Sequence, residues 1–264
     1  MRAARKRSAI AMVMALVIGM SGSGSLTGPL AAGEVALAGP QAHHIAKPET
    51  RLAASAGSQS LDWAGYAVMG RHDTSVSGQW TVPRIGASSA LTASALWIGI
   101  DGISDHHLIQ TGTEQDSLNG RTEYYAWWEI LPAAAVTIRT FSVQPGDRMS
   151  AAIAQVSPGR WRITIRDARS GTFSTTRAYG GSGSSAEWIL EAPYLGRRQP
   201  PLAHIATTGF DHATVNGANP GLVVSEEITL FQNGATVATP SRPDNDRDGF
   251  VLARGSVGPA PPRS

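Results

Sequence analysis

From Leu61 onward the chain is divided by turns into short strand-like segments, and this pattern limits the fold more than any other feature. Residues 161–167 alternate strictly between apolar and polar side chains, whereas residues 95–100 are apolar throughout, as expected of a strand buried on both faces. No segment has the apolar spacing of a long amphipathic helix. The pattern predicts an all-β chain, an antiparallel β-sandwich of two packed sheets (concanavalin-like) with little helix. The other predicted strands span residues 76–82, 122–131, 136–141, 149–156, 172–179, 186–190, 223–232 and 250–254.

The N-terminal segment has the composition of a secretory signal peptide. Four basic residues within the first seven positions precede an apolar run over residues 9–20, and small residues follow. The run is short for a membrane span, so an uncleaved anchor is the weaker alternative. We assign residues 1–38 to the signal, with cleavage between residues 22 and 38, where Ala36-Leu37-Ala38 has the A-x-A form. The mature chain is therefore expected to be secreted, with no membrane attachment.

The remaining boundaries follow from where periodic patterning begins and ends. Residues 39–60 are poor in patterned apolar positions and are expected to be a disordered linker or pro-segment. Residues 61–256 are expected to form the β-sandwich domain, and residues 257–264 a disordered tail.

Charge and cysteine content exclude several classes of function. The formal net charge of the whole chain is +2, but removal of residues 1–38 leaves 18 basic and 19 acidic residues. Because the remaining arginines are scattered singly or in pairs, no cluster for nucleic acid is predicted. The chain has no Cys, which excludes disulfides, thiolate metal sites and a Cys nucleophile.

Glutamates within aromatic strands are the first candidates for chemistry. Alternation over residues 122–131 places Tyr125, Trp127 and Glu129 on one face, and Glu187 shares a face with Glu191 in the same way. Burial would raise the pKa of such carboxyls and suit them to acid–base catalysis. The alternative is a solvated sheet face without a catalytic role.

No metal or cofactor site is predicted. Asp244 begins a run that resembles the start of a calcium loop, but the position that would need Glu is Gly255, so an acidic turn is favoured. His106 and His107 are adjacent and lack an evident third ligand, so we interpret them as a loop pair.

Seven fragments, in order over residues 62–191, resemble the eqolisins, the glutamic peptidases of the scytalidoglutamic type. They are Asp62-Trp63-Ala64-Gly65, Val76-Ser77-Gly78-Gln79-Trp80-Thr81-Val82-Pro83, Trp97-Ile98-Gly99-Ile100-Asp101-Gly102, Leu108-Ile109-Gln110-Thr111-Gly112, Tyr125-Ala126-Trp127-Trp128-Glu129, Pro145-Gly146-Asp147 and Ala186-Glu187-Trp188-Ile189-Leu190-Glu191. The chain differs from the family at Tyr125, where an acidic residue is usual, and in lacking the disulfides of fungal members. The lack of disulfides and the signal segment together resemble a bacterial-type member of the family.

The resemblance implies a secreted acid endopeptidase with a cleft on a concave sheet face. It implies a catalytic dyad of Gln110 and Glu187, in which Glu187 takes a proton from water and the Gln110 amide stabilises the oxyanion. The substrate-binding residues that it implies are Trp63, Asp101, Trp127 and Glu129. The expected partners are protein or peptide substrates, no cofactor is implied, and we expect a monomer.

A secreted carbohydrate-binding or glycoside-hydrolysing β-sandwich is the alternative function. Aromatic side chains beside carboxylates suit sugars as well as peptides. A glycosidase would use two carboxylates, such as Glu129 and Glu187, about 5–9 Å apart, and would leave Gln110 without a required role.

Overall fold

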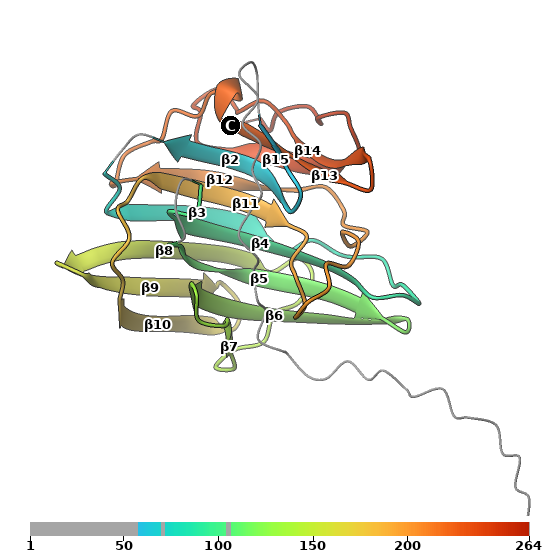
Figure 1. The fold of residues 1–264 in the computed structure, drawn as a ribbon, viewed down its shortest axis with the longest axis horizontal. Helices are drawn as coiled ribbons and strands as arrows, with labels where there is room; N and C mark the ends of the chain where they lie inside the picture. The colour runs from blue at the N-terminus through green and yellow to red at the C-terminus, as the bar shows by residue number, and fades with distance from the viewer. Residues whose placement is uncertain (1–57, 70–71, 104–106, 264) are drawn as a thin grey trace, which may run out of the picture. The chain divides into compact units, whose positions relative to one another are not determined.

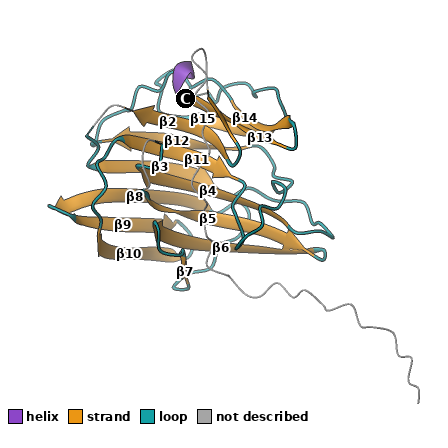
Figure 2. Cartoon of the chain, viewed as in Figure 1, coloured by secondary structure: helices purple, strands orange, loops and turns teal. Residues whose placement is uncertain are grey.

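The computed structural model describes residues 58–69, 72–103 and 107–263, and almost all of their regular structure is β-strand. The all-β prediction is confirmed (Figure 2). The predicted signal peptide and most of the predicted linker lie outside the described residues. Within these residues, no helix is long and apolar enough to cross a membrane. The strands are β1 (Ser58–Ser60), β2 (Trp63–Met69), β3 (Ser75–Thr81), β4 (Thr92–Ile100), β5 (Ile109–Leu118), β6 (Arg121–Ile130), β7 (Val136–Ile138), β8 (Arg148–Ser157), β9 (Arg160–Asp167), β10 (Gly171–Ala178), β11 (Ser185–Glu191), β12 (Thr208–Val215), β13 (Glu227–Gln232), β14 (Ala235–Pro240) and β15 (Phe250–Arg254), with one 3-10 turn, η1 (Val224–Glu226).

The strands follow one hydrogen-bonded path in the order β10-β9-β8-β3-β12-β15-β14-β13-β2-β11-β4-β5-β6-β7, and β1 adds in parallel beside β13 (Figure 1). The path folds over itself, so that β8 and β9 pack against β4 and β5 without pairing with them. The predicted sandwich is therefore confirmed, and its two layers are parts of one continuous sheet. We call β2, β11, β4, β5 and β6 the first layer, and β3, β8, β9 and β10 the second layer.

Alternate side chains from both layers meet in the main core. Burial is nearly complete for the inward residues of β4, β8, β9 and β11, which are Leu96, Ile98, Ile100, Met149, Ala151, Ile153, Trp161, Ile163, Ile165, Ala186, Trp188 and Leu190. The indole N–H of Trp188 donates to the carbonyl oxygen of Ser77 at 2.8 Å, which joins β11 to β3. Burial of this many apolar side chains stabilises the sandwich without disulfides.

The strand boundaries differ from the prediction where polar side chains are buried. Strand β5 extends to Leu118 through Thr113, Gln115 and Asp116, although no strand was predicted beyond Gly112. The buried Thr113 hydroxyl accepts from the indole of Trp80 at 3.0 Å and from Gln115 at 3.0 Å, so tertiary contacts stabilise a strand that its composition disfavours. The predicted strand over residues 223–232 begins as η1, and β12 and β14 were not predicted.

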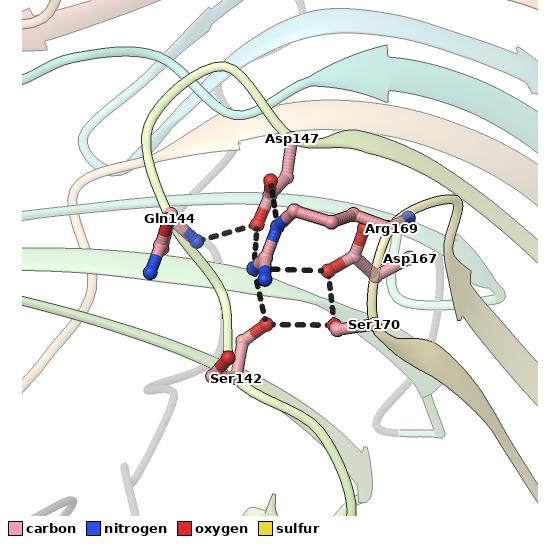
Figure 3. A network of polar contacts seen from close by, with 6 residues as sticks. All are labelled: Ser142, Gln144, Asp147, Asp167, Arg169 and Ser170. Atoms are coloured by element: carbon pink, nitrogen blue, oxygen red, sulfur yellow. Dashed lines mark hydrogen bonds and ion pairs between the residues drawn. The ribbon is translucent and has the colours of Figure 1, made fainter.

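A polar network fixes the turn before β8 against the turn after β9 (Figure 3). The Arg169 guanidinium donates to both carboxylate oxygens of Asp147 at 2.9 Å, and Asp147 also accepts from the backbone N–H of Gln144 at 2.7 Å. The hydroxyl of Ser170 donates to Asp167. Arg169 lowers the pKa of Asp147, because the guanidinium favours the ionised carboxylate.

Candidate active site

Both residues of the predicted dyad, Gln110 and Glu187, lie on the outward face of the first layer, the face turned away from the main core. The predicted alternation is confirmed: Ala126 lies in the main core, whereas Tyr125 and Trp127 pack on the other face of β6. Strand β11 inserts between β2 and β4, with Glu187 opposite Gly99 of β4. Because Gly99 is also opposite Gln110, which is opposite Glu129 in β6, four residues form one row across four strands.

The register brings Glu187 and Gln110 to opposite sides of a glycine. Neighbouring strands lie about 4.8 Å apart, so the Cα atoms of Glu187 and Gln110 are about 10 Å apart, with no side chain from Gly99 between them. The space above Gly99 is tight: a Cβ there would lie 2.8 Å from the Trp97 ring and 3.1 Å from the Leu108 side chain. Glu187, Gln110 and Glu129 are fully buried.

Glu129 holds the amide of Gln110. The Gln110 Nε2 donates to the Glu129 Oε2 at 2.7 Å. Burial raises the pKa of Glu129 to about 8, with a further contribution from Glu114, while the Gln110 hydrogen bond acts in the opposite direction. The Oε1 atom of Gln110 is buried and accepts no hydrogen bond from the described part of the chain. The amide oxygen of Gln110 is thus available to a water molecule or a substrate.

An aromatic cluster surrounds this row. Trp63, Trp97, Trp127 and Leu108 are buried together on the outward face of the first layer. The Trp63 and Trp97 rings meet edge to face, with centroids 4.9 Å apart. The indole N–H groups of Trp63 and Trp127 are buried and, among the described residues, have no hydrogen-bond acceptor. They are suited to donate to carbonyl oxygens of a bound ligand.

A second group of carboxyls lies four residues further along the same strands. Glu191 accepts from the Trp97 indole at 2.6 Å, and Glu114 faces Tyr125 across the β5–β6 pair. Burial raises the pKa of Glu114 to about 8 and that of Glu191 well above its usual value. The Tyr125 hydroxyl donates to Asp116 at 3.2 Å. The prediction that burial raises the pKa of glutamates on these strands is confirmed for Glu129 and Glu191.

Asp101 lies at the end of β4, and its carboxylate faces a loop of the chain. Its Oδ2 accepts from the Tyr179 hydroxyl at 2.6 Å, and its Oδ1 accepts from the backbone N–H of Ser184 at 2.7 Å and from its hydroxyl at 3.0 Å. With φ at +70°, Asp101 adopts the left-handed conformation that the tight connection after β4 requires. These contacts anchor the loop directly before β11, at Ser184, three residues from Glu187.

Sequence reasoning did not single out Gly99, Trp97 or Glu114 as site residues. Gly99 and Trp97 belong to one of the seven family-like fragments. Only the strand register shows that Gly99 lies between the two dyad residues, with the Trp97 ring next to it. Glu114 could have been found by extending the alternation of β5 from Gln110 in steps of two.

The other candidate groups lie elsewhere. The acidic turn predicted at Asp244 is confirmed, since its backbone N–H donates to the Gly249 carbonyl oxygen at 2.9 Å. Asp211, Asp244 and Asp248 bring carboxylate oxygens within 4.8 Å of one another, on segments outside the first layer. His106 lies outside the described residues, and His107 is exposed beside the Tyr179 ring.

Comparison with known proteins places this geometry in a family. A family model described as the Peptidase A4 family matches residues 61–248. Aspergillopepsin-2 from Aspergillus niger is 25% identical over 224 residues, which cover 75% of this chain and 74% of that protein.

Solved structures share the fold. Scytalido-glutamic peptidase with a transition state analog inhibitor matches with a TM-score of 0.63 at 20% identity, over 73% of this chain and 98% of that chain. Aspergilloglutamic peptidase from Aspergillus niger matches with a TM-score of 0.51 at 23% identity, over 62% and 99% of the two chains. Since the family match spans most of the chain, the protein belongs to the Peptidase A4 family, the eqolisins, and is a glutamic endopeptidase.

Proposed function

We propose that this chain is a secreted acid endopeptidase in which Glu187 and Gln110 hydrolyse the peptide bond and Glu129 positions Gln110. The observation that carries the proposal is the row of Glu187, Gly99, Gln110 and Glu129 on one buried face. Secretion is supported by the signal-like composition of residues 1–38. Protein or peptide substrates follow from the family.

The reaction begins with a water molecule held between the two dyad residues. The Glu187 carboxylate removes one proton from this water while the water oxygen attacks the scissile carbonyl carbon. The Gln110 amide donates to the oxyanion of the resulting tetrahedral intermediate. Glu187 then gives its proton to the leaving nitrogen as the C–N bond breaks, which regenerates the carboxylate.

Glu129 suits the role of a positioning residue. Its hydrogen bond with Gln110 fixes which side of the amide is the donor and which is the acceptor. With a pKa of about 8, Glu129 is neutral in acid and adds no negative charge beside a developing oxyanion. An acid-working enzyme is therefore consistent with the charge state of the row.

Residues around the row are proposed to bind substrate. The indole N–H groups of Trp63 and Trp127 are buried within the same aromatic cluster and would donate to peptide carbonyl oxygens. Asp101 acts through the loop that it anchors, because several donors from that loop already occupy its carboxylate. Substrate must displace the groups above Gly99, of which Leu108 is the closest aliphatic side chain.

The glycosidase alternative fits the row less well. Glu129 and Glu187 are three strand spacings apart, so their Cα atoms are separated by about 14 Å, and Gln110 lies between them. A pair of carboxyls about 5–9 Å apart would require both side chains to reach over Gln110.

The test is activity of the mature protein on denatured casein between pH 3 and 5, with pepstatin present. Gln110→Ala and Glu187→Gln should each lower kcat/KM by about 100-fold or more, which is typical for loss of an oxyanion donor or a catalytic base. Glu123→Gln, in the same layer but partly exposed, serves as the matched control and should retain full activity. More than a tenth of parental turnover in either dyad variant would overturn the assignment.

The role of Glu129 has its own test. Glu129→Gln keeps a neutral acceptor for the Gln110 amide and should retain kcat at pH 4 within a few-fold. Glu129→Leu removes the acceptor and should lower kcat while leaving KM nearly unchanged. Equal activity of the two variants would contradict the positioning role.

A further inference from the structure

Arginines that are scattered in the sequence gather on one face of the second layer. In β9, Trp161, Ile163 and Ile165 point into the core, so Arg160, Arg162 and Arg166 are exposed on the opposite side. Arg148 begins β8 on the same outward face, since its neighbour Met149 is buried in the core. This face lies on the other side of the sandwich from the candidate active site.

These four arginines have no partners within the described part of the chain. None of their guanidinium groups forms a hydrogen bond or an ion pair there. Other arginines of the same region are used internally: Arg169 binds Asp147, and Arg177 lies over the Trp128 ring at 5.0 Å. The four guanidinium groups therefore keep their full donor capacity for an external partner.

The rest of this face is small, polar and free of carboxylates. The outward residues of β8, β9 and β10 other than arginine are Ser150, Ala152, Ala154, Ser157, Thr164, Thr172, Ser174, Thr176 and Ala178. Asp167, the acidic residue within these strands, points inward and is buried. With four positive charges and no negative charge on its outward positions, this face attracts anions at any pH at which the protein is folded.

Two hollows widen the face into a groove. A cavity of about 730 Å³ is lined by Arg84 and Arg148, and one of about 300 Å³ is lined by Arg166 and Thr164. Gln79 and His212 line both hollows, so the two hollows are neighbours across β3. Asp211, at the β12 side of the larger hollow, is the one carboxylate among its lining residues. The groove thus runs from the larger hollow over β3 and β8 to β9.

The spacing of the arginines matches a linear polymer. Arg160 and Arg162 are two residues apart on one strand, which separates them by about 7 Å. Arg148 is opposite Ala168 and therefore diagonal to Arg166, at a Cα distance of about 7–8 Å. Arg162 and Arg166 are about 13 Å apart, or two such intervals. Cations repeat along the face at about the interval of phosphates in an extended phosphodiester chain.

We propose that this face, formed by Arg148, Arg160, Arg162 and Arg166, binds a linear phosphodiester polymer and holds the enzyme with its catalytic face turned outward. Planar guanidinium groups match phosphate oxygens in pairs, and phosphodiesters stay ionised in acid, where carboxylated polymers lose charge. The inference concerns a surface outside the dyad and does not depend on the proposed hydrolysis.

The experiment measures binding of the mature protein to poly(glycerol phosphate) at pH 4.5 by a fluorescence titration at several salt concentrations. Four phosphate contacts predict a salt slope of about −2.8, so Kd should rise about 50-fold between 50 and 200 mM salt. A quadruple Arg→Gln variant at the four positions should lose this binding and its salt dependence.

The control is a second quadruple Arg→Gln variant with the same change in charge. Its positions are exposed arginines outside the face, namely Arg121, Arg139, Arg197 and Arg198. It should bind like the parent, and both variants should cleave a short soluble peptide at the parental rate. Equal loss in both variants would overturn the assignment to this face, and absence of binding in the parent would overturn the proposal. Binding to polygalacturonate, a carboxylated polymer, as tight as to poly(glycerol phosphate) would overturn the choice of a phosphodiester partner.

Discussion

The stability of the domain should fall steeply between pH 4 and pH 7, because buried glutamic acids of the first layer stay protonated in the folded state and ionise when the chain unfolds. The folded-state pKa of Glu114 and of Glu129 is raised from 4.5 to about 8, chiefly by burial. In the unfolded chain both groups lose their protons near pH 4.5. The folded state therefore holds more protons over this range, and stability is full below pH 4.5 and is lost as the pH rises toward 8.

The size of the effect follows from the shift. A group with a pKa of 4.5 when unfolded and about 8 when folded lowers the free energy of unfolding by about 3 kcal/mol at pH 7 relative to pH 4. Glu114 and Glu129 together give between about 3 and 6 kcal/mol, since their charges interact and the two effects are not additive. Domains of this kind are stable by about 5–15 kcal/mol, so the loss is a large fraction of the total.

Urea unfolding at pH 4 and pH 7, followed by tryptophan fluorescence, measures this difference. Glu114→Gln replaces the buried acid with a neutral side chain of the same shape and should reduce the loss by up to about 3 kcal/mol. Glu123→Gln, partly exposed on β6, is the control and should leave the pH dependence of the parent unchanged. Equal stability of the parent at both pH values would refute the reasoning, as would a Glu114→Gln variant with the full parental loss.

Three further predictions concern local contacts. Gly99→Ala places a methyl group 3.1 Å from the Leu108 side chain. It should lower kcat/KM more than 10-fold and the free energy of unfolding by about 1–3 kcal/mol. Full activity of this variant in steady-state kinetics would contradict the prediction. Asp101→Asn keeps the left-handed conformation but loses carboxylate acceptors, and urea unfolding should show a loss of about 1–3 kcal/mol. Arg169→Met removes the cation that lowers the pKa of Asp147, so the melting temperature should drop at pH 6, where Asp147 is ionised, and match the parent near pH 2. A melting temperature that drops equally at both pH values would point to lost packing instead.

The local sequence pattern predicted those strands in which buried and exposed positions can be recognised from the residues themselves. The strict alternation in β9 comes from one buried and one exposed face, so its range is nearly correct. Strand β5 was predicted only in part, because Thr113 and Gln115 are polar and become strand residues through partners such as Trp80, far away in sequence.

The candidate site shows the same limit. Alternation alone placed Glu187 on a face with Glu191, but only the pairing of β11 with β4 and of β4 with β5 shows that Glu187 and Gln110 flank Gly99. Non-local register of this kind is not encoded in the spacing of any one segment, so the dyad had to come from family resemblance. The arginine face depends less on register: alternation within β9 already puts Arg160, Arg162 and Arg166 on one side, and the pairing of β8 with β9 adds Arg148.

The central position of β11 also has a consequence for how the chain acquires its activity. Strand β11 pairs with β2 and β4, which end at Met69 and Ile100, whereas β11 begins only at Ser185. Closing such distant pairs is slow and comes late in folding, since long loops must be ordered before the contacts form. Glu187 therefore joins Gln110 only when most of the sandwich has assembled. A chain in the course of synthesis would thereby be kept from digesting itself or its neighbours before folding is complete.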